Sequence, residues 1–137
     1  MKKIFLLITV LLLSKFGISQ YQNQNIGDTI HAIHYSIHIE DVNTTQQSIS
    51  GFTEIKITPL VSNLNYIALE LLELTADSVF VNENAATYNH NNIRLTINLD
   101  SPISPNDTIL VKVYYHGQPF SEAWGGFHFS GDYAFNL

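Results

Sequence analysis

Six histidines and twelve acidic residues are the side chains of this 137-residue chain that could bind a metal ion or transfer protons. His31, His34 and His38 fall in a segment that alternates polar and apolar residues, as a β-strand does. On a strand, His34 and His38 share one face about 13 Å apart, and parity places His31 on the other face. Zinc needs ligand nitrogens about 2.0–2.1 Å from one centre, so we interpret all three as solvated strand histidines.

The sequence motifs of the common catalytic sites do not occur in this chain. No histidine is followed by glutamate, which excludes the His-Glu-x-x-His motif of zinc peptidases, and there is no Gly-x-Ser-x-Gly or Ser-x-x-Lys. The chain has no cysteine, so thiolate chemistry is excluded as well. Glu40 and Asp41 stand at a predicted strand end, and Asp100 and Asp107 flank a predicted loop, which indicates turn chemistry or solvation. We therefore assign no catalytic, substrate-binding or metal-binding residue to this chain.

The first 19 residues have the pattern of a secretory signal peptide. Met1, Lys2 and Lys3 give a positive start, an apolar run covers 4–13, and small residues before position 20 fit cleavage after Ser19. The apolar run is about half of the ~20 residues that a membrane-spanning helix needs. These features predict a secreted or periplasmic protein without a membrane span.

Removal of the signal leaves a strongly acidic protein. Three basic and twelve acidic residues remain, which gives a net charge of −9. A domain of this charge repels a phosphate backbone, so nucleic acid is excluded as a partner. Without disulfides, the remaining residues have to be stabilised by a hydrophobic core.

Alternation with a period of two runs through most of the remaining chain. Residues 33–39 and 49–58 predict a hairpin of two half-buried strands around a turn at 44–47, and Pro59 ends the second strand. Residues 65–75 contain good helix formers, but we favour a strand with a bulge at Leu71-Leu72 over a helix. Further predicted elements are a short strand at 79–81, a return segment at 85–88, a turn at 89–92, strands at 93–99 and 109–115, and a loop at 100–107.

These elements predict an all-β fold, an antiparallel β-sandwich or saddle-like two-sheet domain of about seven or more strands. We divide the chain into the signal peptide 1–19, a lead-in 20–30, a β domain 31–117, and an aromatic and glycine-rich continuation of that domain at 118–137. The continuation concentrates aromatic area around Trp124 without a clear period, which favours packing against another surface. The alternative is a tail folded under its own sheet. The apolar end at Leu137 favours a chain truncated at its C-terminus.

Six stretches, taken in order, resemble the N-terminal β domain of the M1 (aminopeptidase N-like) zinc metallopeptidases. His34-Tyr35 opens the first like the family's H-Y-x-L-x-L strand, and Ile49-Ser50-Gly51 opens the second like its I-x-G strand. The stretches are 34–39, 49–57, 69–82, 99–107, 113–119 and 125–127. One departure is Val81-Asn82-Glu83, where the family has V-N-G.

The resemblance implies a non-catalytic domain of a secreted zinc aminopeptidase-like protein. In such a protein this domain packs on a downstream catalytic domain of the same polypeptide, which carries the zinc, and helps to form the cleft for the peptide substrate. The family's zinc-binding and exopeptidase motifs do not occur in this sequence, so no such residue is carried over.

Two other interpretations stay open at this point. The first is a non-enzymatic secreted sandwich module for adhesion or carbohydrate binding. The second is an M1-like domain kept as a scaffold in a protein whose catalytic motif has been lost.

Overall fold

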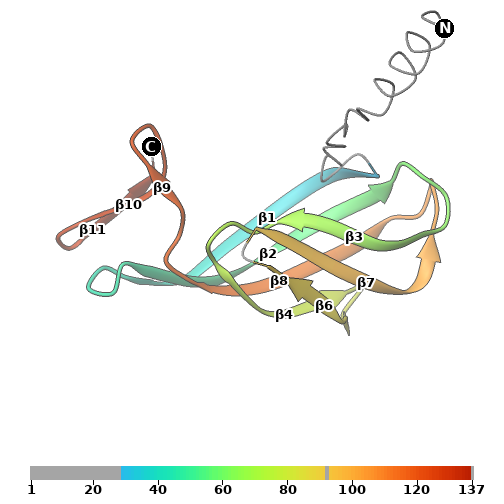
Figure 1. Cartoon of the computed structure of the whole chain (residues 1–137), viewed down its shortest axis with the longest axis horizontal. Helices are drawn as coiled ribbons and strands as arrows, with labels where there is room; N and C mark the ends of the chain where they lie inside the picture. The colour runs from blue at the N-terminus through green and yellow to red at the C-terminus, as the bar shows by residue number, and fades with distance from the viewer. Residues whose placement is uncertain (1–28, 92, 137) are drawn as a thin grey trace, which may run out of the picture.

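The computed structural model describes residues 29–91 and 93–136, so the predicted signal peptide 1–19 lies outside the described residues. Eleven strands and no helix occur in that part of the chain, which confirms the all-β prediction (Figure 1). The strands are β1 (Ile30–Asn43), β2 (Ser48–Pro59), β3 (Leu64–Glu70), β4 (Thr75–Val81), β5 (Asn84–Ala85), β6 (Tyr88–His90), β7 (Arg94–Ile103), β8 (Ile109–Gly117), β9 (Ser121–Glu122), β10 (Gly125–Ser130) and β11 (Tyr133–Asn136). None of the described elements is a helix long and apolar enough to cross a membrane.

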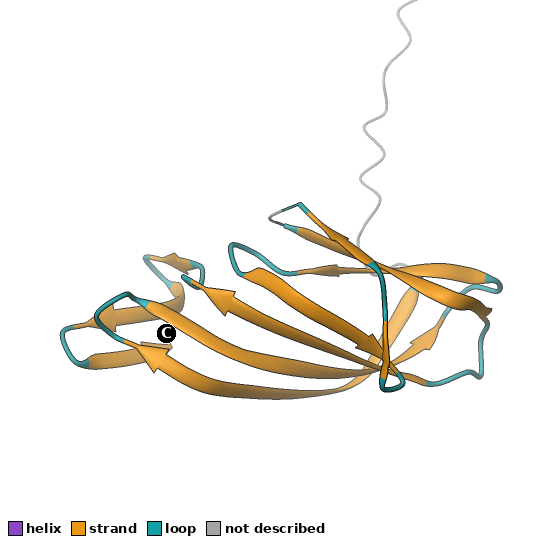
Figure 2. Ribbon diagram, turned by 90° about the horizontal axis from the view of Figure 1, so that it is seen from below, coloured by secondary structure: helices purple, strands orange, loops and turns teal. Residues whose placement is uncertain are grey.

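Three antiparallel sheets make up the fold. The main sheet has the order β1-β2-β8-β4-β5, and a second sheet has the order β3-β7-β6. Figure 2 shows the main sheet as a curved layer with the second sheet over one end of it. The third sheet, β11-β10-β9, lies at the other end of the molecule and pairs with neither of the first two (Figure 1).

The hydrophobic core lies between the main sheet and the second sheet. Strands β2 and β8 alternate buried and solvent-facing residues because each is half-buried, as the period of two predicts. Ile57 and Val111 of the main sheet and Ile67 and Ile97 of the second sheet are fully buried. All of the buried residues are apolar or small, and no described polar or charged residue is among them.

Two bulges shape β1, the edge strand of the main sheet. The pairing with β2 shifts between Ala32 and His34 and again between Ile39 and Asp41. At the second shift Ile39 pairs with Gly51, and a Cβ atom on Gly51 would fall well inside contact distance of the main-chain oxygen of His38. Glycine is therefore required at this point because the backbones of the two strands approach closely.

The predicted segment 65–75 is a strand, as favoured, but its bulge is elsewhere. β3 ends at Glu70, so Leu71 and Leu72 lie outside it, and the shift in pairing with β7 falls between Leu64 and Tyr66. Glu73 has a φ of 62°, which turns the chain into β4. The Leu71-Leu72 break in the alternation thus marks the end of the strand and not a bulge within it.

Three other predicted boundaries are wrong. The return segment pairs with β4 through Asn84 and Ala85 and through a 2.9 Å hydrogen bond from the Ala86 N–H to the Val79 oxygen, and Tyr88 already begins β6 in the second sheet. Asn89 and His90, predicted as a turn, belong to β6. Residues 100–103, predicted as loop, continue β7 to Ile103, so the loop is confined to 104–108.

Candidate functional site

The three clustered histidines of β1 are exposed, and all three lie on the outer face of the main sheet. Pairing places His31 opposite Thr58, His34 opposite Lys56 and His38 opposite Phe52, and these three β2 residues share one face of the sheet. The prediction that His31 occupies the opposite face was wrong, because the bulge at Ile33 reverses the parity of the strand. No group of three or more histidine, aspartate or glutamate side chains within the described ranges could hold a metal ion.

Aromatic rings from neighbouring strands line this outer face. His38 of β1 stacks on Phe52 of β2 with ring centroids 4.3 Å apart, and Phe52 lies 5.2 Å from Tyr114 of β8. The Lys112 Nζ lies 3.9 Å from the Phe52 centroid and 3.1 Å from Glu54 Oε1. The hydrogen bond with Glu54 is the main reason that the pKa of Lys112 is raised above its ordinary value. The ammonium is thus held by a carboxylate and a ring face together.

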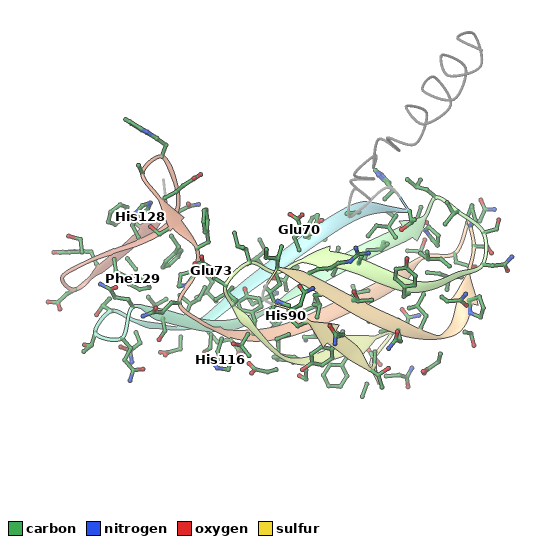
Figure 3. All side chains as sticks on the ribbon, in the orientation of Figure 1. Glu70, Glu73, His90, His116, His128 and Phe129 are labelled. Carbon is green, nitrogen blue, oxygen red and sulfur yellow. The ribbon has the colours of Figure 1, made fainter. Side chains whose placement is uncertain are left out.

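Two polar pairs were not predicted, because the residues of each pair are far apart in the sequence. His116 Nδ1 and Asp77 Oδ1 are 2.7 Å apart, and both side chains are largely exposed. His90 donates a hydrogen bond of 2.8 Å from Nε2 to the main-chain oxygen of Leu71. Asp77 is the residue at which the pairing of β4 with β8 shifts, and no pattern in the sequence indicates that shift. Figure 3 shows His90 and His116 at separate places on the two sheets.

An apolar groove of about 510 Å³ opens between the main sheet and the second sheet along the β1 edge. It forms because the second sheet covers the start of β1, where Ile30 and Ala32 pack on the core, but not its middle. The inward-facing Tyr35, Ile37 and Ile39 stay 54%, 67% and 45% exposed, so the prediction of a half-buried β1 was wrong. The groove is lined by Ile30, Ala32, Tyr35, Ile37, Thr53, Ile55, Ala68, Leu69, Glu70, Leu71, Leu95, Val113 and Tyr115.

Strands β9, β10 and β11 form an aromatic arm, which we define as residues 121–136. A two-residue turn joins β9 to β10 and holds Trp124 at its tip, where the side chain is 94% exposed. Gly126 has a φ of 90°, and a Cβ there would lie 2.5 Å from the Phe120 oxygen. The tight turn that displays Trp124 therefore needs glycine at position 126.

The polar side chains of the arm stabilise the arm itself. His128 donates from Nε2 to the Gly125 oxygen at 3.0 Å, and its Nδ1 lies 3.0 Å from Ser121 Oγ. In the neutral ring with its proton on Nε2, Nδ1 therefore accepts a hydrogen bond from the Ser121 hydroxyl. The aromatic side chains of the arm are less well packed, since the large ring of Tyr133 is 77% exposed. Figure 3 shows His128 and Phe129 on the arm, apart from the other labelled residues.

Comparison with known structures places this geometry in a known fold. A variant of a two-domain M1 zinc metallopeptidase bound to L-arginine superimposes with a TM-score of 0.64 at 18% identity, over 71% of this chain and 22% of that chain. For the M1 zinc metallopeptidase from Deinococcus radiodurans the TM-score is 0.62 at 20% identity, over 67% and 21%. Leukotriene A4 hydrolase from Saccharomyces cerevisiae gives 0.55 at 16% identity, over 70% and 16%.

The chain has the fold of the N-terminal β domain of M1 zinc metallopeptidases. It spans about one fifth of the length of the M1 metallopeptidase structures that it matches. No protein-family model matches the sequence, and no curated protein matches it. The six sequence stretches that suggested the M1 β domain therefore predicted the fold correctly at an identity of only 16–20% in these superpositions.

Proposed function

We propose that this chain is the non-catalytic N-terminal β domain of a secreted zinc aminopeptidase-like protein. The observation that carries the proposal is the match of 71% of this chain to 22% of a two-domain M1 zinc metallopeptidase. The zinc and the general base of such an enzyme would belong to a catalytic domain, on which this domain packs and with which it helps to form the peptide cleft.

The aromatic arm supports the packing part of the proposal. Trp124 and Tyr133 leave large ring surfaces in water, and such surfaces usually mark an interaction site. Tryptophan is also among the residues that most often dominate the binding energy of an interface. Among the described strands, β9–β11 pair only with one another, so the arm can present these rings to a second surface.

The alternative of an adhesion or carbohydrate-binding module gains no better support from the fold or from the comparisons. Export of the chain with cleavage after Ser19 is part of the proposal. N-terminal sequencing of the protein recovered from the medium or the periplasm tests it, with Gln20 expected as the first residue. An intact Met1 in the cytoplasm would contradict it.

The test of the catalytic partner starts from the coding sequence beyond Leu137. We expect a His-Glu-x-x-His motif, followed about twenty residues later by a glutamate, as the two-histidine, one-carboxylate set of a peptidase zinc site requires. The protein that includes it should lose activity on aminoacyl substrates when zinc is chelated. Replacement of Trp124 by alanine should weaken the packing of the two domains, seen as faster limited proteolysis between them, while Leu60→Ala on the opposite part of the fold should not. A stop codon directly after Leu137, or a series of sandwich domains in the following coding sequence, would refute the proposal.

A further inference from the structure

β1 is an unprotected edge strand. It is 14 residues long, it forms one end of the main sheet, and within the described residues only β2 pairs with it. Natural edge strands usually carry lysine, proline or other features that prevent pairing with another chain. The sequence of β1 contains no lysine, arginine or proline. Its two bulges lie at the ends, so that residues 34–39 form an uninterrupted regular run.

The inward face of this regular run is apolar and uncovered. Tyr35, Ile37 and Ile39 are all about half exposed or more, and Tyr35 and Ile37 form part of one wall of the apolar groove. The opposite wall includes Leu69 and Leu71, next to the free edge of β3. As far as the described residues go, the sandwich is therefore open along one side, where an apolar surface and an unpaired strand edge coincide.

We propose that β1 pairs antiparallel with β1 of a second copy of this chain, around a two-fold axis at Ile37. In this register, Ile37 faces Ile37 of the second copy, and Tyr35 faces Ile39 of the second copy, so the inward side is apolar throughout. On the outer side, Ser36 faces His38 of the second copy. Aromatic and β-branched side chains that face each other across an antiparallel pair stabilise it.

The sequence of β1 fits a second copy because it is complementary to itself. The strand starts with His31 and His34 and ends with Glu40 and Asp41. Antiparallel pairing brings the histidine end of one copy near the acidic end of the other, whereas parallel pairing would place acid beside acid. A shift of the axis to Ser36 would set His34 opposite His38 of the second copy. A slip by one residue would turn the apolar side chains toward polar ones.

The pairing also explains what covers the groove. A two-fold axis perpendicular to the main sheet keeps the second sheets of both copies on the same side. The two grooves then open toward each other across the axis, and their apolar walls form a shared core. This interface uses β1 and leaves Trp124 of the aromatic arm free, so it is separate from the proposed packing on a catalytic domain.

Cysteine cross-linking tests the register directly, because the chain contains no cysteine. In an antiparallel pair the Cα atoms of facing residues are about 4.5–5.5 Å apart, which a disulfide spans. Ile37→Cys should therefore form a disulfide-linked dimer on mild oxidation. Ile39→Cys is the matched control on the same face, since its two copies would lie about 14 Å apart along the strands. The double variant Tyr35→Cys/Ile39→Cys should cross-link again.

Sedimentation of the purified wild-type chain completes the experiment. We expect a dimer at micromolar concentration, and Ile37→Lys should weaken it at least about tenfold by placing two like charges on the axis, with the circular dichroism unchanged. Trp124 fluorescence should be the same in monomer and dimer, which distinguishes this interface from docking of the arm. A monomeric wild type, equal cross-linking of Ile37→Cys and Ile39→Cys, or cross-linking of Ser36→Cys instead would overturn the proposal.

Discussion

Replacement of Gly51 by alanine tests the close approach of β1 and β2 that shapes the edge of the main sheet. The added Cβ would lie 3.0 Å from the main-chain carbon of His38 and 3.1 Å from the Ile39 Cα, besides its clash with the His38 oxygen. These are backbone atoms, so no side-chain rotation can relieve the contact. β1 has to move away, and the hydrogen bonds next to the bulge are stretched or lost.

The expected loss follows from these two terms. Overpacking at a rigid site costs about 1–3 kcal/mol. One or two weakened hydrogen bonds cost about 0.5–1.5 kcal/mol each. Because the movement relieves part of the clash, we expect Gly51→Ala to lower the free energy of unfolding by about 2–4 kcal/mol.

Urea unfolding followed by circular dichroism measures this loss as a lower midpoint with an unchanged slope. Gly125→Ala is the matched control, because the nearest atom to its Cβ is the flexible Glu122 side chain at 3.3 Å and its φ is not positive. A Gly51→Ala variant within about 0.5 kcal/mol of the wild type would refute the argued strand approach.

Three further predictions concern the core, the outer face and the arm. Ile57→Ala, at a fully buried position, should lower the free energy of unfolding in urea by about 2–5 kcal/mol. Leu60→Ala, at an exposed position, should lower it by less than about 0.5 kcal/mol. Similar losses for the two variants would contradict the described core. The raised pKa of Lys112 stabilises the fold below its ordinary value of 10.5, and this contribution is lost as the pH rises through the raised pKa. Glu54→Gln should remove it, so the stability difference from the wild type should shrink above pH 10.5, and an NMR titration of Nζ should give a lower pKa. Trp124, the sole tryptophan, should be fully accessible to quenching by acrylamide, and its fluorescence should have the emission maximum of indole in water. Protection of Trp124 from acrylamide in the isolated chain would contradict an exposed tip.

The sequence predicted well the strands that have one face in the core and the other face toward solvent. β2 and β8 alternate because one face packs in the core, so their residues follow the period of two. β1 alternates as clearly, but its apolar face at Ile37 is uncovered. Periodicity indicates that one face of a strand is suited to burial, but it does not indicate what covers that face. The sequence therefore could not show that the prediction of a half-buried β1 was wrong.

Register and strand ends were the features that the sequence could not supply. The bulge at Ile33 moved His31 to the face of His34, and nothing in the local alternation distinguishes such an extra residue from a regular one. Residues 100–107 were predicted as a loop because they hold Pro102 and Pro105, yet β7 continues through residues 100–103. Proline is tolerated where its missing N–H is not needed by a neighbouring strand.

The candidate site was predicted only as an aromatic segment. Trp124, Gly125 and Gly126 were predicted to belong to a surface that packs on another one, which stays a prediction, and their arrangement as a tight turn with Trp124 at its tip was not foreseen. The apolar groove depends on how far the second sheet extends over β1. That distance is a tertiary property, because it is set by where β3 and β7 cross the main sheet.

We propose that this β domain belongs to a zinc peptidase, and isolation of the natural protein from its source tests that proposal. An antibody against the described domain should recover a polypeptide much longer than 137 residues. It should contain about one zinc ion per chain, as a peptidase zinc site holds, and its aminoacyl-peptide hydrolysis should stop on chelation and return with zinc. Recovery of a mature protein no longer than this chain, free of zinc and without peptidase activity, would contradict the account.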